Sequence, residues 1–307
     1  FKVFYITCNR IKMLRNLARM NVFVTFPRIL YVGILRCIIS FHLDMCRHTD
    51  IIPVFTAIFF FFESRNSTSI VTGIMEFPDS VEIISYQTKV TDTESLIKRG
   101  KDADIIMVAN LPLNADVIKG CKNLKMLAVA FTGIDHIAMD ACKEQGIMVC
   151  NCAGYSNAAV SDLVFGLLIS LYRNIISCNE VVRKEGTKDG LVGFELEGKK
   201  FGVVGTGAIG TRVANIAQAF GCEVYAYSRT VKDLAGVQYV DLEELLSTCD
   251  IISLHVPLNA STKGLISEKE IALMKPNAVL INTSRGPVVD SKALALSLIH
   301  ISEPTRP

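Results

Sequence analysis

Hydrophobic positions from about residue 81 to residue 151 fall into short runs separated by stretches with helical spacing. Alternating apolar and polar residues predict a strand at 81–86, and apolar runs predict strands at 102–110, 123–131 and 146–151. An amphipathic helix is expected at 93–99. Strands that alternate with helices are typical of a parallel sheet. We therefore expect an α/β domain over residues 75–172.

A longer helical pattern runs from about 157 to 184 and so crosses the expected end of this domain. It carries apolar residues on more than one face. A helix that is apolar on several sides is buried rather than half-exposed. We therefore predict one continuous helix packed between two layers.

A second α/β unit begins at about residue 199. The pattern again alternates strands with helices, which favours a dinucleotide-binding domain of the Rossmann type over residues 173–296. The expected strands are 201–205, 223–228, 250–256 and 278–284, and the expected helices are 208–220, 242–247 and 268–274.

The first 74 residues differ in character from the rest. They hold two apolar stretches, at 21–41 and 51–62, but Arg28 and Arg36 interrupt the first and the second has only twelve residues. A membrane-spanning helix needs ~20 mostly apolar residues, and a secretory signal fits poorly. We favour a non-native leader with a natural start at Met75; a membrane anchor and an additional structural element are the alternatives. Residues 297–307 are also expected to be a non-native tail.

Charge and cysteine content narrow the functional class. Residues 1–74 hold nine Lys or Arg against three Asp or Glu, a balance of +6, so the net charge of +2 leaves −4 for the remainder. That remainder has no basic footprint for nucleic acid. The ten cysteines form no Cys-x-x-Cys pair and no Cys/His cluster with zinc spacing. We expect a cytoplasmic protein with neither disulfides nor a metal.

A glycine-rich turn lies between the first strand and the first helix of the second unit. Gly205, Gly207 and Gly210 form the pattern G-x-G-x-x-G, with Ala208 and Ile209 between the last two. Gly205 permits the tight turn, Gly207 lets a pyrophosphate approach the backbone, and Gly210 lets the helix pack closely on the strand. The helix N-terminus then favours the phosphate charge.

The cofactor is expected to be NADP rather than NAD. NAD-binding sites place Asp or Glu at the end of the second strand, where it binds the ribose 2′-OH. Here that strand ends in Ser228 and Arg229. A hydroxyl can donate to a 2′-phosphate and a guanidinium can neutralise it. The alternative for Arg229 is a solvated arginine without a ligand.

Four further motifs together identify a family. They are FTGIDH at 131–136, GYSNAAVSD at 154–162, HVPL at 255–258 and NTSRGPVVD at 282–290. The sequence resembles the D-isomer-specific 2-hydroxyacid dehydrogenases from about residue 77 to residue 294. The resemblance implies a flavodoxin-like substrate domain beside the Rossmann domain, with a cleft between them that closes on the substrate. It also implies a homodimer and hydride transfer between NAD(P) and a small 2-hydroxy or 2-keto acid, such as glyoxylate or hydroxypyruvate. The alternative is a non-catalytic dinucleotide sensor on the same fold.

The resemblance also implies roles for individual residues. Arg285 corresponds to the catalytic, substrate-binding arginine, whose planar guanidinium suits a carboxylate beside a carbonyl. Thr132 and Gly133 correspond to the turn whose backbone N–H groups meet the substrate carboxylate. His136 is expected to support that turn and not to act as acid or base. The remaining family contacts to the cofactor correspond to Val160, His255, Pro257, Thr283 and Ser284, although Val160 also fits a plain core position.

The family's proton-transfer pair is expected to be missing. In the family a Glu follows the arginine by some thirty residues and a His by some sixty, whereas this sequence ends 22 residues after Arg285. His300 and Glu303 stand at the wrong spacing, so neither role is transferred to them. We expect this loss to impair the activity of the chain, because general acid–base catalysis typically contributes ~10²–10⁴ in rate.

Overall fold

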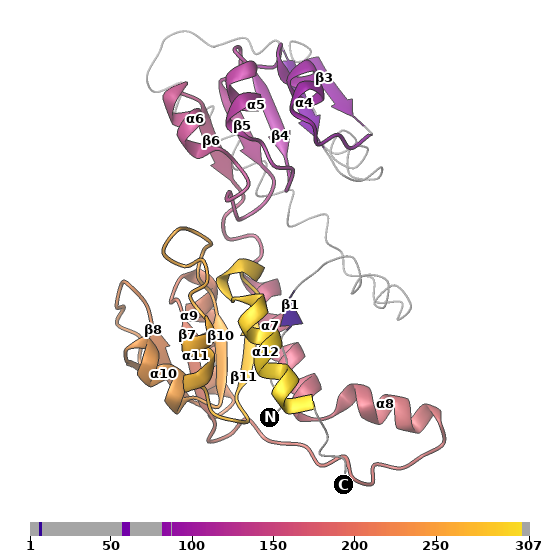
Figure 1. Cartoon of the computed structure of the whole chain (residues 1–307), viewed down its shortest axis with the longest axis vertical. Helices are drawn as coiled ribbons and strands as arrows, with labels where there is room; N and C mark the ends of the chain where they lie inside the picture. Colours follow the sequence, from indigo (N-terminus) through magenta and orange to yellow (C-terminus); the bar gives the residue numbers. More distant parts are fainter. Residues whose placement is uncertain (1–5, 8–56, 62–81, 87, 303–307) are drawn as a thin grey trace. The chain divides into compact units, whose positions relative to one another are not determined.

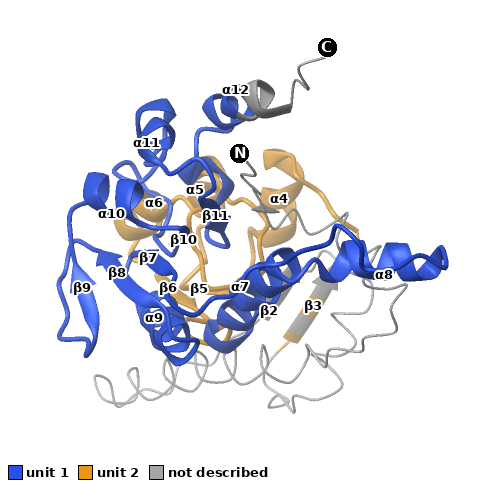
Figure 2. Ribbon diagram, turned by 90° about the horizontal axis from the view of Figure 1, so that it is seen from below, with its two compact units in different colours: residues 1–22, 157–307 blue, residues 23–156 orange. Residues whose placement is uncertain are grey.

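The computed structural model describes residues 6–7, 57–61, 82–86 and 88–302. The chain divides into two compact units, one formed by residues 1–22 with 157–307 and the other by residues 23–156 (Figure 2). The division between Ser156 and Asn157 lies before the long helix, whereas the sequence analysis placed it between residues 172 and 173, inside the helix expected at 157–184. The helix belongs with the second sheet because Val164, Phe165 and Leu168 lie in that sheet's core.

Residues 23–156 form a five-stranded parallel sheet, shown in purple and magenta in Figure 1. Its strand order is β3-β2-β4-β5-β6. Leu96, Ile106, Ile118 and Leu127 lie in the apolar cluster that joins the sheet to its helices. The strands are β2 (Ala57–Phe61), β3 (Glu82–Tyr86), β4 (Ile105–Val108), β5 (Met126–Val129) and β6 (Met148–Asn151), and the helices are α4 (Thr93–Gly100), α5 (Ala115–Gly120) and α6 (Met139–Glu144).

Strand β2 comes from the stretch that the sequence analysis left outside the domain. It pairs in parallel with β3 through Ala57 and Glu82, and with β4 through Ile58 and Ile105. A segment that looked too short for a membrane span is thus an inner strand, and inner strands of parallel sheets are typically continuous apolar runs. Most of residues 1–74, and residues 303–307 of the tail, lie outside the described residues. The native or non-native origin of both ends stays a prediction.

The other unit, drawn in blue in Figure 2, carries a six-stranded parallel sheet with the order β1-β11-β10-β7-β8-β9. The chain moves from β7 to β8 on one side and then returns to place β10 on the other side of β7. This reversal is the topological switch point at which α/β sheets bind ligands. The strands are β1 (Ile6–Thr7), β7 (Lys200–Val204), β8 (Glu223–Tyr227), β9 (Val237–Tyr239), β10 (Ile251–Leu254) and β11 (Val279–Asn282).

Helices cover both faces of this sheet (Figure 1). Phe201 and Val203 point into a cluster with Val213 on one face, whereas Val204 lies in a cluster with Leu245 on the other. This alternation is the period of two expected along a strand. The first face carries α7 (Asn157–Tyr172) and α9 (Ala208–Ala219), and the second carries α10 (Leu242–Thr248), α11 (Glu268–Leu273) and α12 (Ser291–Ser302).

The prediction of one continuous helix over 157–184 is wrong. The structure has α7, a break, and then α8 (Ile175–Arg183), at an angle of 55°. Asn174 adopts a left-handed backbone with φ of 51°, and its side-chain amide donates to the carbonyl of Val192 at 3.1 Å. Asparagine tolerates this conformation better than most residues. The break separates a helix with five buried residues from one with none.

None of the helices that the structure describes is by itself long and apolar enough to cross a membrane. The bent pair α7 and α8 together meets the criteria of length and composition.

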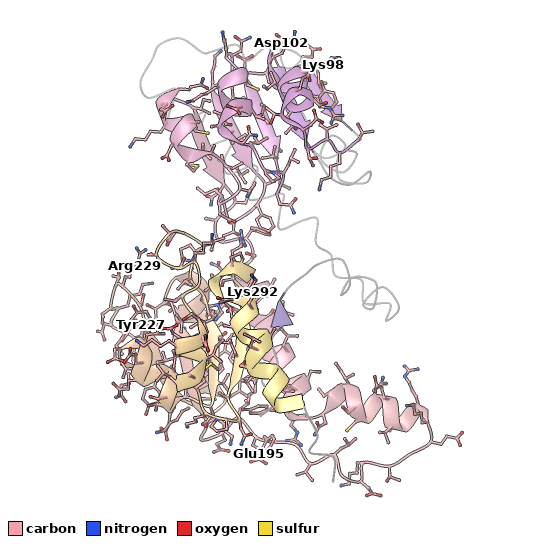
Figure 3. The ribbon with its side chains drawn as sticks, viewed as in Figure 1. Lys98, Asp102, Glu195, Tyr227, Arg229 and Lys292 are labelled. Atoms are coloured by element: carbon pink, nitrogen blue, oxygen red, sulfur yellow. The ribbon has the colours of Figure 1, made fainter. Side chains whose placement is uncertain are left out.

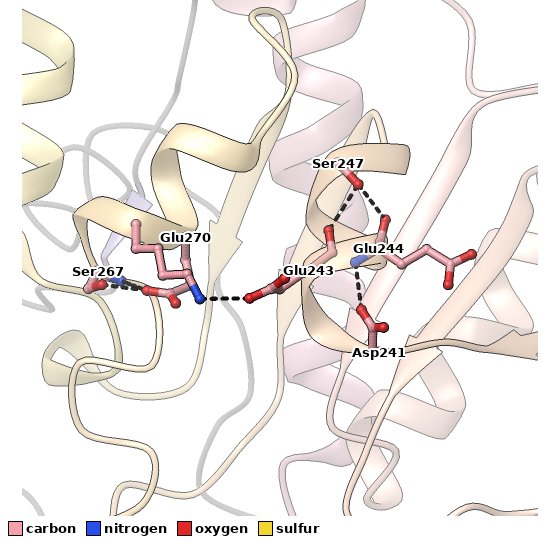
Figure 4. A network of polar contacts seen from close by, with 7 residues as sticks. Asp241, Glu243, Glu244, Ser247, Ser267 and Glu270 are labelled. Atoms are coloured by element: carbon pink, nitrogen blue, oxygen red, sulfur yellow. Dashed lines mark hydrogen bonds and ion pairs between the residues drawn. The ribbon is translucent and has the colours of Figure 1, made fainter.

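Side-chain caps fix the starts of α10 and α11 (Figure 4). Asp241 accepts a hydrogen bond from the Glu244 N–H at 2.8 Å, and Ser267 forms a reciprocal capping box with Glu270. Lys269 joins the two helices through Glu243 at 2.6 Å. Such caps typically contribute ~1 kcal/mol each, whereas an ion pair as exposed as this one adds little to stability.

Candidate functional site

The glycine-rich turn follows β7 and leads into α9. Gly205 has a φ of +97°, and a Cβ at this position would lie 2.7 Å from the carbonyl oxygen of His255. Its N–H donates to the carbonyl of Tyr227 at the end of β8, at 2.7 Å. Both the backbone conformation and the space therefore require glycine at position 205.

The other two glycines serve different purposes. A Cβ on Gly210 would lie only 1.9 Å from the carbonyl oxygen of Gly205, so any side chain there would push α9 off the turn. A Cβ on Gly207 would meet nothing within 4 Å. Packing thus requires glycine at 210, whereas at 207 it leaves open space beside the turn.

The N-terminus of α9 lies beside this open space. Gly207 is its N-cap, and no side chain caps the helix. The first N–H groups of an α-helix have no acceptor within the helix, and they carry a partial positive charge. An exposed backbone without a Cβ at Gly207, next to these N–H groups, fits the pyrophosphate of a dinucleotide.

Ser228 and Arg229 follow β8. Ser228 is half-buried and Arg229 is exposed at the surface of the unit, near Tyr227 (Figure 3). Neither position carries a carboxylate. The loop beyond them is fastened to the glycine-rich turn, because the Tyr239 hydroxyl donates to Thr206 Oγ1 at 3.1 Å and accepts from the Lys232 N–H at 3.2 Å. Sequence reasoning missed Tyr239, since nothing in the pattern indicates a partner 33 residues away.

His255 follows β10 and is held by a buried serine. Its ring atom Nε2 lies 2.8 Å from Ser253 Oγ. The backbone N–H of His255 donates to the Val204 carbonyl at 2.8 Å. Burial lowers the pKa of His255 from 6.5 to about 4. The imidazole is therefore neutral at pH 7. The loop continues through Pro257, whose carbonyl accepts from the Thr262 hydroxyl at 2.5 Å.

The turn after β11 carries Arg285 and is organised by Asn282. The side-chain amide of Asn282 donates to the Arg285 carbonyl at 2.9 Å. The side-chain oxygen of Asn282 accepts from the Ser284 N–H at 3.1 Å and from the Ser284 hydroxyl at 2.8 Å. Asn282 is buried. Sequence reasoning assigned it no role, although a polar residue at the end of an apolar strand is a recognisable pattern.

Thr283 and Arg285 lie beside this asparagine. The Thr283 hydroxyl is buried and has no hydrogen-bond partner in the described part of the chain. A buried hydroxyl without a partner is costly, so a bound ligand is a reasonable source of one. The Arg285 guanidinium lies 3.4 Å from the Ser284 carbonyl and is half-buried.

The unit of residues 23–156 carries the predicted substrate turn, directly after β5. Thr132 and Gly133 are half-buried. The Thr132 carbonyl accepts from the side-chain amide of Asn151 at 2.6 Å, and its hydroxyl lies 3.2 Å from Ser156 Oγ. His136 ends the turn, and its carbonyl accepts from the Leu113 N–H at 3.0 Å. Asn151 was not predicted.

Most of the predicted positions follow parallel strands of one sheet. The carboxyl ends of β7, β8, β10 and β11 share one edge, so the glycine-rich turn, Ser228, His255 and Arg285 gather there. Val160 lies half-buried on α7. Within the ranges that the structure describes, no three His, Cys, Asp or Glu side chains are grouped to hold a metal.

Two glycine substitutions should separate packing from ligand binding. Gly207→Ala meets no protein atom, so we expect an unchanged melting temperature and a loss of dinucleotide affinity of tenfold or more, because the methyl group fills the approach to the backbone. Gly210→Ala should lower the melting temperature as well, since its methyl group collides with backbone. Differential scanning fluorimetry and NADPH fluorescence titration measure both. A Gly207→Ala protein with intact affinity would contradict this assignment.

The low pKa of His255 should make stability depend on pH. The folded state resists protonation down to about pH 4, whereas the unfolded chain takes up a proton near pH 6.5. The unfolded state therefore binds more protons in this window, and the free energy of unfolding should fall as pH is lowered from about 6.5 to 4. The slope is at most about 1.4 kcal/mol per pH unit. Urea unfolding of the wild type and His255→Gln across this range tests it, and equal slopes would refute the prediction.

Comparisons with known proteins agree with these features. Residues 165–300 match the model of the D-isomer specific 2-hydroxyacid dehydrogenase NAD binding domain. The chain is 40% identical over 218 residues to a hydroxypyruvate reductase of Thermotoga maritima. The aligned residues cover 69% of this chain and 71% of that protein. It is 39% identical over 216 residues to a glyoxylate reductase of Thermococcus litoralis, covering 66% of this chain and 65% of the reductase.

Solved structures give the same answer. The D-lactate dehydrogenase of Aquifex aeolicus, solved with NAD and lactic acid, is 31% identical, with a TM-score of 0.69 over 80% of this chain and 73% of that one. Sequence, fold and the strand-end constellation thus agree, and the chain belongs to the D-isomer specific 2-hydroxyacid dehydrogenase family.

Proposed function

We propose that this protein is an NAD(P)-dependent oxidoreductase that acts on a small 2-hydroxy or 2-keto acid, with glyoxylate and hydroxypyruvate as the first candidates. The observation that carries the proposal is the shared strand edge. A turn whose shape suits a dinucleotide follows β7, and Arg285, whose backbone carbonyl accepts from the buried Asn282, follows β11, with only β10 between these strands of one parallel sheet. The names of the relatives, a hydroxypyruvate reductase and a glyoxylate reductase, support the substrate class.

The residues around this edge fit the cofactor. Gly205, Gly207 and the N-terminus of α9, with Ala208 and Ile209, would hold the pyrophosphate, and Ser228 with Arg229 would meet the adenosine ribose. The unpartnered Thr283 hydroxyl, Ser284, His255 and Pro257 would line the path toward the nicotinamide, and Val160 would pack near it. When bound, the nicotinamide supplies or accepts the hydride.

Arg285, Thr132 and Gly133 would bind the substrate. The guanidinium hydrogen-bonds the carboxylate and the neighbouring carbonyl oxygen, and so polarises the carbonyl. Backbone N–H groups of the turn at 132–133 meet the carboxylate. Reduction adds a hydride to the carbonyl carbon and a proton to its oxygen, which gives the 2-hydroxy acid and the oxidised cofactor. We assign the proton donor to none of the described residues, because the family resemblance gives that role to neither His136 nor His255.

Arg285 provides the test of the substrate class. Oxamate resembles pyruvate and cannot be reduced, so it should bind the chain in the presence of NADPH even when turnover is slow. Arg285→Gln should weaken this binding about tenfold to a hundredfold, because a hydrogen bond to a charged group contributes ~1.5–3 kcal/mol. Calorimetry measures it, with the exposed Arg183→Gln on α8 as the matched control.

Oxidation of NADPH in the presence of glyoxylate or hydroxypyruvate, followed at 340 nm, completes the test. Dinucleotide binding without oxamate binding and without turnover would contradict the dehydrogenase function. That outcome would favour the dinucleotide-sensor alternative.

The cofactor preference follows from the end of β8. A carboxylate at position 228 would repel a 2′-phosphate, whereas Ser228 and Arg229 can bind it. A charge-assisted hydrogen bond is worth about tenfold to a hundredfold in affinity, and the exposure of Arg229 favours the lower end. We therefore expect NADPH to bind more tightly than NADH, and Ser228→Asp with Arg229→Ala to reverse the order. Nicotinamide fluorescence titrations measure all four affinities, and tighter NADH binding by the wild type would show that Arg229 plays no part.

We also propose, from the family resemblance, a homodimer in the cytoplasm. Ile176 and Val182 on α8 are 64% and 67% exposed, which supports a surface covered by a second copy. Light scattering that gave a monomeric mass would contradict the dimer, and cell fractionation tests the location.

A further inference from the structure

We propose that Asn151 is a positioning residue that orients the peptide between Thr132 and Gly133 for the substrate carboxylate. This inference rests on the proposed function, because it assumes that the carboxylate meets the N–H groups of this turn. It adds a residue that holds the turn in its binding conformation without touching the substrate.

Two carbonyls at the start of the turn after β5 are anchored from the end of β6. Val129 and Asn151 are register partners, so the two strands end side by side. Beyond them the Cys152 N–H donates to the Phe131 carbonyl at 3.0 Å. The Asn151 side chain then donates to the next carbonyl, that of Thr132, at 2.6 Å. Two successive carbonyls of the turn are thus held from one side.

A third contact fixes the side chain of the turn. The hydroxyls of Thr132 and Ser156 lie 3.2 Å apart. Ser156 is the residue just before α7. Backbone, side-chain amide and hydroxyl therefore hold three consecutive points of the turn.

The geometry of the peptide bond determines which way the Gly133 N–H points once the Thr132 carbonyl is held. The peptide bond is planar and trans, and the structure has no cis peptide in its described ranges. In a trans peptide the C=O and N–H point in opposite directions. Since the Thr132 carbonyl faces Asn151, the Gly133 N–H must face away from it. Within the same described part of the chain, neither the Thr132 nor the Gly133 N–H has a protein acceptor.

The chemistry of the position requires an amide. Without the Asn151 donor, the half-buried Thr132 carbonyl loses its partner, and the peptide can rotate to seek water. Rotation would turn a carbonyl oxygen, instead of an N–H, toward an anionic ligand. Aspartate has the same shape but only accepts hydrogen bonds when ionised, so it would repel the Thr132 carbonyl and favour that rotation.

The experiment compares Asn151→Ala, Asn151→Asp and the wild type for oxamate binding in the presence of saturating NADPH. We expect both variants to bind oxamate at least tenfold more weakly while their NADPH affinity stays within twofold, because the dinucleotide turn belongs to the other unit. Asp92→Ala removes the cap of α4 in the same unit as Asn151. It serves as the control for a loss of stability without a change in the turn.

Nuclear magnetic resonance of the amide groups distinguishes positioning from a general structural role. In the wild type and in Asp92→Ala, oxamate should shift the Gly133 amide proton; in the Asn151 variants this shift should be lost. Variants that bind oxamate like the wild type would overturn the role of Asn151 and leave the proposed function intact. A wild type that binds oxamate without a shift at Gly133 would overturn this inference and the assignment of the turn at 132–133 to the carboxylate, while the reaction and the role of Arg285 would stand. A wild type that does not bind oxamate would overturn both. If Asn151→Ala is too unstable to assay, the shape-conserving Asn151→Asp decides the matter.

Discussion

The carbonyl oxygen of Gly205 occupies the place where any side chain at position 210 would have to go. A Cβ there would lie 1.9 Å away, so α9 can approach the end of β7 only because residue 210 is glycine. This contact sets the distance and angle at which the helix leaves the turn. The N–H groups of the first turn of α9, and the open space at Gly207, owe their positions to it. The fold and the dinucleotide site therefore share one steric constraint.

A second kind of interaction, a side-chain hydrogen bond that holds a turn, recurs near the ends of the strands. Asn282 at the end of β11, Asn151 at the end of β6 and Ser253 within β10 each place a polar group against the segment that follows a strand. Each hydrogen bond restricts a turn that the strand alone would leave free. Buried polar groups are costly unless they are paired, so these partners must form for the unit to fold. Folding thereby fixes the orientation of Arg285, of the turn at 132–133 and of His255.

The sequence was sufficient for features that depend on local pattern. The apolar runs predicted β4 and β7, and the glycine spacing predicted the turn at 205–210, because each of these features depends on residues that are close together in the sequence. Features that depend on distant partners could not be predicted. The break at Asn174 relies on the carbonyl of Val192, and the role of Asn151 relies on a turn some twenty residues earlier. Strand β2 was overlooked because Ala57–Phe61 lies in a segment whose composition differs from the rest, although its backbone pairs with both β3 and β4.

The charges at the strand edge suit the binding of an anion but not the transfer of a proton. Arg285 and Arg229 follow β11 and β8, the N-terminus of α9 adds a partial positive charge, and none of the positions assigned to the site in this unit is a carboxylate. His255 does not change this balance, because burial lowers its pKa to about 4 and leaves it neutral at physiological pH. A neutral imidazole bound to Ser253 can shape the site without competing for the charge of a phosphate or a carboxylate. The described edge is therefore suited to hold and polarise an anionic substrate beside a dinucleotide, while the exchange of a proton with that substrate requires a group of a different kind.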